Sequence, residues 1–124
     1  MITTKLLLKL NPKAPQSITG VLNADGSIEI EWDAVQGAKS YLIHYGGANQ
    51  SQPSQAIYMG YSTTNKWTLA DTDIPVTETD DKLYFYVQAY EELGVGATDA
   101  EKAQYLHDGD FLGSAWSKSI TLTV

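Results

Sequence analysis

The segment Lys82–Tyr90, KLYFYVQAY, constrains the fold of this chain more than any other stretch. Its residues alternate between two sets with a period of two. One set contains Leu83, Phe85, Val87 and Ala89, and the other contains Tyr84, Tyr86, Gln88 and Tyr90. Alternation of this kind in aromatic and aliphatic residues predicts a β-strand with one face in a hydrophobic core. Other apolar segments must therefore supply the opposite side of that core.

Six further segments have the composition of short strands and are separated by turn signals. They are Pro15–Asn23, Ser27–Trp32, Tyr41–Tyr45, Ala56–Tyr61, Lys66–Ala70 and Ser117–Val124. The dipeptide Asp25-Gly26 predicts a hairpin turn between the first two, because glycine tolerates positive φ. The pattern as a whole predicts an all-β fold, a seven-stranded antiparallel β-sandwich of the immunoglobulin-like kind.

Alternation within these strands also predicts which side chains form the core. In the second strand Ile28, Ile30 and Trp32 fall on the inward face, with Glu29 and Glu31 on the outward one. In the third strand Tyr41, Ile43 and Tyr45 share one face, and Leu42 and His44 share the other. In the first strand the core candidates are Ile18 and either Val21 or Leu22. Trp67 and Leu69 share a face in the fifth strand.

The long connection Glu91–Ala115 interrupts the strand pattern before the last strand. At its centre Thr98-Asp99-Ala100-Glu101 has the form of a capping box, followed by residues that favour helix. We therefore expect a short helix over Asp99–Leu106.

The N-terminal stretch, residues 1–14, is predicted to be an arm or an extra strand preceding a domain at residues 15–124. Written as a strand, it places Leu6, Leu8 and Leu10 on one side. Asn11-Pro12 marks a turn or linker, because proline disfavours helix in its predecessor. An uncovered row of leucines is a contact surface, so one hypothesis is a homo-oligomer formed through these three residues.

Length and charge exclude several classes of protein. A chain of 124 residues forms one domain of ordinary size, and a net charge of −7 argues against nucleic acid as a partner. No apolar run reaches the ~20 residues that span a bilayer, so we expect no membrane insertion. No secretory signal is recognised at the N-terminus. Either the chain stays in the cytoplasm of the cell that makes it, or it is an excised extracellular module.

The segment Trp32–Tyr45, WDAVQGAKSYLIHY, resembles the passage between the second and third strands of fibronectin type III domains, especially bacterial and phage ones. Further matches are Pro15, Phe85-x-Val87-x-Ala89, Gly94 and Ser117. The resemblance implies the sandwich fold and a non-catalytic module whose end loops recognise partners.

The chain departs from this family in two places. Leu83 occupies the position where the family usually carries a tyrosine that ties the strand end to upstream backbone, unless Tyr84 supplies it in a shifted register. The connection between the last two strands is also far longer than usual. No Arg-Gly-Asp is present, so integrin binding through that motif is not implied.

The residues that carry chemistry do not assemble into a catalytic pattern in the sequence. His44 and His107 are the only histidines, without a matching nucleophile. We expect His44 to face solvent or to make a cross-strand contact. His107, Asp108 and Asp110 lack the fuller acidic pattern of a calcium loop. We therefore predict no metal, no cofactor and no enzymatic activity.

Aromatic side chains are the candidate binding residues. Tyr84, Tyr86 and Tyr90 lie opposite the core face of their strand, and Tyr105, Phe111 and Trp116 lie in or beside the long connection. Tyrosine and tryptophan supply large, rigid contact areas in recognition surfaces. The alternatives are cross-strand packing for the first three and folding back onto the sheet for the others. We expect a recognition end built from Gly46–Pro53 and Glu91–Ala115.

Three functions remain open from the sequence. The leading interpretation is a non-catalytic binding or spacer module for a protein or glycan surface. A second is a bacteriophage virion protein of the tail or capsid, since phage particles carry domains that resemble this one. A third is a carbohydrate-binding module that stacks sugars on Tyr84, Tyr86, Tyr90 or Trp116.

Overall fold

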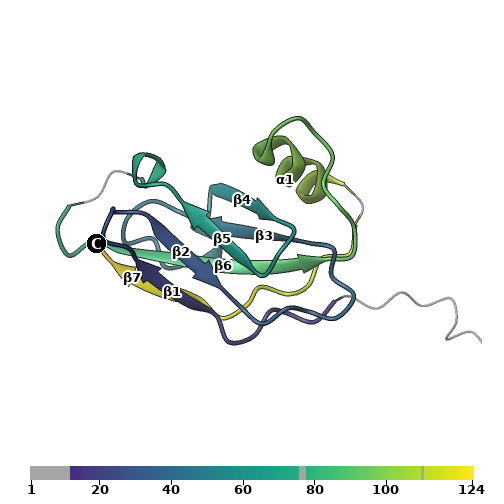
Figure 1. The fold of residues 1–124 in the computed structure, drawn as a ribbon, viewed down its shortest axis with the longest axis horizontal. Helices are drawn as coiled ribbons and strands as arrows, with labels where there is room; N and C mark the ends of the chain where they lie inside the picture. The colour runs from purple at the N-terminus through teal and green to yellow at the C-terminus, as the bar shows by residue number, and fades with distance from the viewer. Residues whose placement is uncertain (1–11, 76–77, 110) are drawn as a thin grey trace, which may run out of the picture.

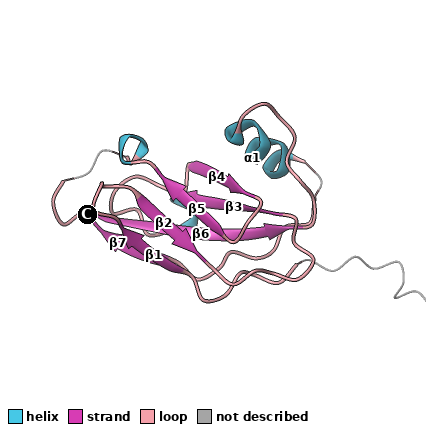
Figure 2. Cartoon of the chain, in the orientation of Figure 1, coloured by secondary structure: helices cyan, strands magenta, loops and turns pink. Residues whose placement is uncertain are grey.

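The computed structural model describes residues 12–75, 78–109 and 111–124, and Leu6, Leu8, Leu10 and Asp110 lie outside them. Within these ranges the chain forms seven strands, one α-helix and two short 3-10 turns (Figures 1 and 2). The strands are β1 (Thr19–Leu22), β2 (Ile28–Glu31), β3 (Ser40–Tyr45), β4 (Tyr58–Ser62), β5 (Lys66–Leu69), β6 (Lys82–Tyr90) and β7 (Ile120–Thr123). The helical elements are η2 (Pro53–Gln55), η3 (Asp71–Asp73) and α1 (Asp99–Asp108). The all-β fold with a short helix before the last strand is confirmed.

The strands form two antiparallel sheets that face each other. One sheet has the order β1-β2-β5 and the other has the order β4-β3-β6-β7. β6 has the bounds that the alternation predicts and lies between β3 and β7, where Ile43 is paired with Val87 and Phe85 with Ile120. Both of its edges are therefore hydrogen-bonded, one to β3 and the other to β7.

The β1–β2 hairpin turns at Asp25-Gly26, as predicted. Gly26 has φ of +90°, and the Ser27 backbone N–H donates to Asp25 Oδ1 at 2.9 Å. The turn aligns Leu22 with Ile28 in the antiparallel register.

The core between the sheets contains the side chains that alternation assigned to it in β2, β3 and β6. Trp32 and Tyr41 pack edge to face with ring centroids 5.1 Å apart, and both are buried. The Tyr41 hydroxyl accepts a hydrogen bond from the Val35 backbone N–H at 2.9 Å, which ties the loop after β2 to the core. Trp67 and Leu69 of β5 both pack against this cluster, as predicted.

The prediction that Val21 or Leu22 enters the core is wrong. Their exposed fractions are 53% and 41%, while Ile18 is the residue of this segment that packs against the core. The reason is the position of Gly20, where an added Cβ would meet the side chain of Leu122 at 3.2 Å. Gly20 therefore faces inward, and alternation turns Val21 toward solvent. Leu22 shares the face of Gly20, but it is the last residue of β1 and is exposed there.

Gly60 allows β4 and Trp67 to approach each other. It is buried opposite Ile43, and an added Cβ would lie 2.3 Å from the Trp67 indole. We expect Gly60→Ala to lower the free energy of unfolding by about 2 kcal/mol, because an inserted methyl must displace a packed ring. Urea denaturation followed by circular dichroism measures the change.

Gly47→Ala is the matched control, because its Cβ would meet only the Gln50 side chain, at 3.3 Å. We expect its midpoint to stay close to that of the parent chain. Equal midpoints for the two variants would contradict the close contact between Gly60 and Trp67.

Candidate functional site

The helix α1 begins at the capping box seen in the sequence. The Thr98 hydroxyl accepts a hydrogen bond from the Glu101 backbone N–H at 3.2 Å, and Glu101 Oε1 accepts one from the Thr98 backbone N–H at 3.1 Å. The helix runs to Asp108, two residues beyond the predicted end. Its buried residues, Ala103 and Leu106, are three positions apart and share one face.

This buried face of α1 covers the outer surface of the four-stranded sheet. Ala103 and Leu106 form a second apolar cluster with Leu42, Tyr61 and Tyr90. The Tyr61 hydroxyl also accepts a hydrogen bond from the Gly94 backbone N–H at 2.9 Å, which fixes the chain before the helix. The long connection therefore folds back onto the sheet, and Figure 1 shows α1 beside β4 and β3.

Of the candidate binding residues Tyr84, Tyr86 and Tyr90, two are buried by packing, which is the alternative that the sequence left open for them. Tyr86 and Tyr90 are 5% and 6% exposed, and Tyr84 is half-buried. The Tyr86 hydroxyl donates to the Ser51 carbonyl oxygen, and its ring meets the Trp116 ring edge to face at 5.3 Å. Burial raises the pKa of the Tyr86 and Tyr90 hydroxyls. The covering of this face leaves no continuous stacking platform on β6.

The expectation of one recognition end built from Gly46–Pro53 and Glu91–Ala115 is wrong. β3 and β6 are antiparallel, with Tyr45 paired to Phe85 and Ser40 paired to Tyr90, so the two loops leave opposite ends of the sheet. The Asn49 backbone N–H accordingly donates to the Lys82 carbonyl oxygen at 2.7 Å.

His44 lies beneath the covering of the outer face rather than in solvent, and it is 2% exposed. Its cross-strand partners are Tyr86 and Met59. Its ring centroid lies 4.3 Å from that of Trp116 and 6.1 Å from that of His107. Its Nε2 atom has no hydrogen-bond partner among the described residues. Burial, opposed by a hydrogen bond to Gln88 and reinforced by His107, lowers the pKa of His44 to about 4.

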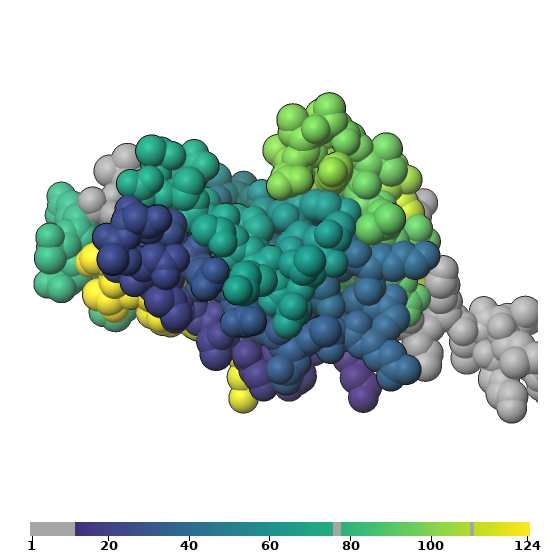
Figure 3. All heavy atoms as spheres, in the orientation of Figure 1, coloured from purple at the N-terminus to yellow at the C-terminus, as the bar shows by residue number. Residues whose placement is uncertain are grey.

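The solvent side of α1 forms an open groove of about 580 Å³, which we call the α1 groove. Its lining residues are Val95, Gly96, Glu101, Gln104, Tyr105, Asp108, Gly109 and Phe111. The Tyr105 and Phe111 rings lie 5.1 Å apart, so the structure brings these two predicted residues together. Trp116 lies elsewhere, against His44 and Tyr86. Figure 3 shows the segment that carries α1 projecting from the body of the sandwich.

The α1 groove combines apolar and acidic groups. Tyr105 is 43% exposed and Val95 is 60% exposed. Asp108 is ionised at neutral pH, and hydrogen bonds from Gln104 and then from His107 lower its pKa further. Such a groove can hold an apolar side chain beside a cationic one.

Exposed apolar residues are concentrated in the connection between β6 and β7, from Leu93 to Trp116. Nine large apolar side chains are exposed in the described ranges, and five of them are Leu93, Val95, Tyr105, Leu112 and Trp116. Leu93, Val95 and Leu112 were not predicted from the sequence, because loops have no periodicity that separates exposed from buried positions.

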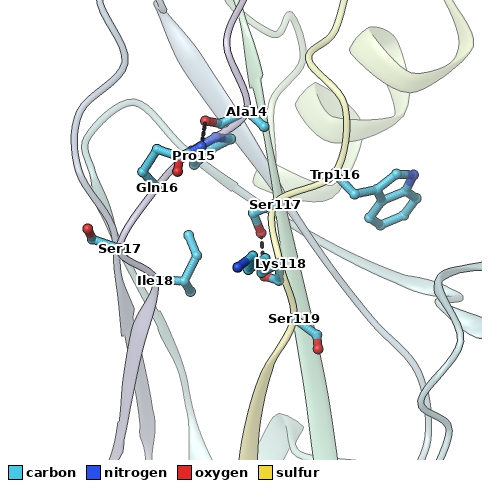
Figure 4. Close-up of a pocket in the computed structure, with 9 residues that line it drawn as sticks. All are labelled: Ala14, Pro15, Gln16, Ser17, Ile18, Trp116, Ser117, Lys118 and Ser119. Atoms are coloured by element: carbon cyan, nitrogen blue, oxygen red, sulfur yellow. Dashed lines mark hydrogen bonds between the residues drawn. The ribbon is translucent and has the colours of Figure 1, made fainter.

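A second groove, of about 380 Å³, lies between residues 14–18 and residues 116–119 (Figure 4). Ile18 points into it, whereas the Trp116 ring turns away from Ile18. Its polar side chains bond to nearby backbone, Gln16 to the Ala14 carbonyl oxygen and Ser117 to that of Lys118. We therefore place the candidate site at the α1 groove, where charged and aromatic groups converge.

Neither a metal-binding cluster nor a membrane-spanning helix is present in residues 12–75, 78–109 and 111–124. These ranges contain no group of three or more His, Asp or Glu side chains placed to hold a metal ion. His107 Nδ1 contacts Asp108 Oδ1 at 3.1 Å. Among the same residues, no helix has both the length and the apolar character needed to cross a bilayer.

Comparison with known proteins identifies the fold. No protein-family model and no curated protein matches the chain. Among the solved structures that match it are the fn3 domain of the human collagen alpha-1(XX) chain, FN3tt, and the FN5 domain of Drosophila Lar.

The match to the collagen domain has a TM-score of 0.55 at 13% identity and covers 90% of this chain and 84% of that one. FN3tt gives a TM-score of 0.52 at 15% identity, with coverage of 94% and 95%. The Lar domain gives a TM-score of 0.50 at 13% identity, with coverage of 90% and 95%. The fibronectin type III-like fold is thereby confirmed.

Burial of His44 predicts a pH dependence of stability. Its pKa falls from the ordinary 6.5 to about 4 in the folded chain, so between these values the unfolded chain binds a proton that the folded chain does not. The free energy of unfolding should therefore decrease by about 3 kcal/mol as the pH falls from 6.5 to 4. Urea denaturation at a series of pH values measures it.

His44→Phe keeps a ring against Trp116 and removes the titration, so the difference between the two pH profiles isolates His44 from the carboxylates. His44→Gln serves if the phenyl ring is not accommodated. Parallel profiles for parent and variant would show that His44 titrates normally.

Proposed function

We propose that this fibronectin type III-like chain is a non-catalytic binding module whose α1 groove recognises a protein partner. The observation that carries the proposal is the pair of Tyr105 and Phe111 rings, 5.1 Å apart beside the carboxylates of Glu101 and Asp108. The other face of the same helix packs on the sheet, so these groups have a rigid support. Aromatic groups on a rigid support are typical of the energetic centres of protein interfaces.

The chemistry of the groove favours a partner segment with both apolar and basic side chains. An aliphatic or aromatic side chain would cover Val95, Tyr105 and Phe111. A lysine or arginine would meet Glu101 and Asp108, whose carboxylates contact Ala97, Thr98, Gln104 and His107 among the described residues. Charge complementarity of this kind mainly orients the partner and speeds encounter, while apolar burial supplies affinity.

The two alternatives from the sequence gain less support. A carbohydrate-binding module needs an exposed ring platform, and burial of Tyr86 and Tyr90 removes two of its four proposed members. The proposal of a virion protein rests on the sequence alone.

Selection from a randomised peptide library tests the proposed function. We expect the selected peptides to contain lysine or arginine next to leucine or an aromatic residue, and to shift the NMR resonances of Val95, Tyr105 and Phe111. Tyr105→Ser should weaken their binding about tenfold, the size expected for loss of a central aromatic contact.

Val21→Thr is the matched control, because it also reduces an exposed apolar side chain but lies on the opposite sheet. Its affinity for the selected peptides should equal that of the parent chain. Peptides that shift only resonances of β1, β2 and β5, or that bind Tyr105→Ser undiminished, would contradict the proposal.

A further inference from the structure

Charge is distributed unevenly along this chain. Residues 1–13 contain Lys5, Lys9 and Lys13 and no acidic residue. The connection Glu91–Ala115 contains six acidic residues and one lysine. The basic stretch also carries Leu6, Leu8 and Leu10, and the acidic one carries the α1 groove. The two stretches are therefore complementary both in charge and in apolar character.

We propose that the α1 groove of one copy binds the segment Lys5–Leu10 of a second copy, so that the chain associates head to tail. This inference rests on the proposed function and names the partner of that site. Leu6, Leu8 and Leu10, on one side of the extended segment, cover Val95, Tyr105 and Phe111. Lys5 and Lys9 alternate to the other side, and their long side chains extend around the segment to the carboxylates of Glu101 and Asp108 at the rim of the groove. The side chain of Asp108 is 58% exposed, so it is open to an approaching ammonium group.

The dimensions of the sheet favour a second copy over the same chain. Residues 14–18 lie against residues 116–119, just before β7, whereas α1 packs on β4 at the other edge of the sheet. Three strand spacings separate these edges by about 14 Å. The groove lies on the far side of α1, which adds about 10 Å.

Chain length then limits what the same copy can reach. Leu10 lies four residues before Ala14 and extends no more than about 14 Å from it. Its own copy therefore cannot place all three leucines over the groove. Figure 1 shows the first described residues and α1 on opposite margins of the sandwich. A neighbouring copy has no such restriction.

The contact joins two different surfaces, and this determines the kind of assembly. The basic segment of each copy and the α1 groove of each copy remain available to further neighbours. Association of this type forms rings when the rotation closes and open chains when it does not. We therefore expect average mass to rise with concentration.

Sedimentation velocity on the full-length chain, over a range of concentrations, measures the association. The combined variant Leu6→Ser, Leu8→Ser and Leu10→Ser should sediment as a monomer at all concentrations, and so should Tyr105→Ser. Both should keep the thermal unfolding temperature of the parent chain. Val21→Thr is the control and should associate as the parent does. A parent chain that stays monomeric throughout the range would overturn the inference.

Charge reversal tests the pairing of the two surfaces. Lys9→Glu and Asp108→Lys should each weaken association about fivefold, because each places like charges together at a solvent-exposed contact. The double variant should recover the parent affinity to within about twofold. Failure of the double variant to recover would show that the two side chains do not meet.

Mixing experiments distinguish a second copy from the same chain. The triple serine variant keeps the groove, and Tyr105→Ser keeps the basic segment, so an equimolar mixture should form one-to-one pairs. A mixture that remains monomeric, with NMR shifts at Val95 in the parent that are independent of concentration, would mean that each chain fills its own groove. That result overturns the inference.

The failure of this inference and that of the proposed function give different results. If the parent chain is monomeric but library peptides bind the α1 groove, the groove recognises another protein and only the second copy is excluded. If neither copies nor peptides bind there, the proposed function fails as well.

Discussion

The rest of the structure depends on the pairing of β3 with β6, because both strands are apolar on both faces. All six residues of β3 are buried, and so are six of the nine residues of β6. On the inner face Ile43 and Val87 are held by the opposite sheet. On the outer face Leu42, His44, Tyr86 and Tyr90 must be removed from water by something else, since exposed apolar area on this scale is unfavourable. The helix α1 and Trp116 provide that cover. The long connection before β7 is therefore part of the packing of the sheet.

This role of the connection explains why the proposed binding surface lies on α1. A helix of 3.6 residues per turn that directs Ala103 and Leu106 toward the sheet necessarily directs Gln104, Tyr105 and Asp108 away from it. The capping box at Thr98 fixes where the helix starts, and hence which residues face each way. The exposed groups are then as rigid as the packing beneath them. The burial of His44 ties that packing to pH, because a charged imidazole under Trp116 and next to His107 would favour opening of the cover.

Sequence patterns predicted where strands and the helix occur better than they predicted what packs against each of their faces. The bounds of β6, the hairpin at Asp25-Gly26 and the start of α1 follow from local rules, since each depends only on neighbouring residues. Alternation told which side chains share a face, but it cannot tell whether a face meets water or another element. For His44, Tyr86 and Tyr90 the sequence therefore left solvent exposure and cross-strand packing open, and the structure shows packing. A signal was present in β3, where Leu42 lies opposite Tyr41 and Ile43 and makes both faces apolar. The α1 groove was beyond such rules, because Tyr105 and Phe111 meet across the end of the helix.

The distribution of charge along the chain favours the proposed pairing of the N-terminal segment with the α1 groove over other contacts between two copies. Three of the eight lysines lie in residues 1–13, so the residues from Ala14 onward carry fifteen acidic groups against five lysines. Two such bodies repel each other at distances within the Debye length of about 10 Å at 0.1 M salt. Apolar contact alone would therefore form against an electrostatic barrier in most orientations. The basic N-terminal segment reverses the sign of the charge at one place only. Net repulsion therefore disfavours contact between the α1 groove and most other parts of a second copy. The groove can still bind a segment that combines leucine with lysine.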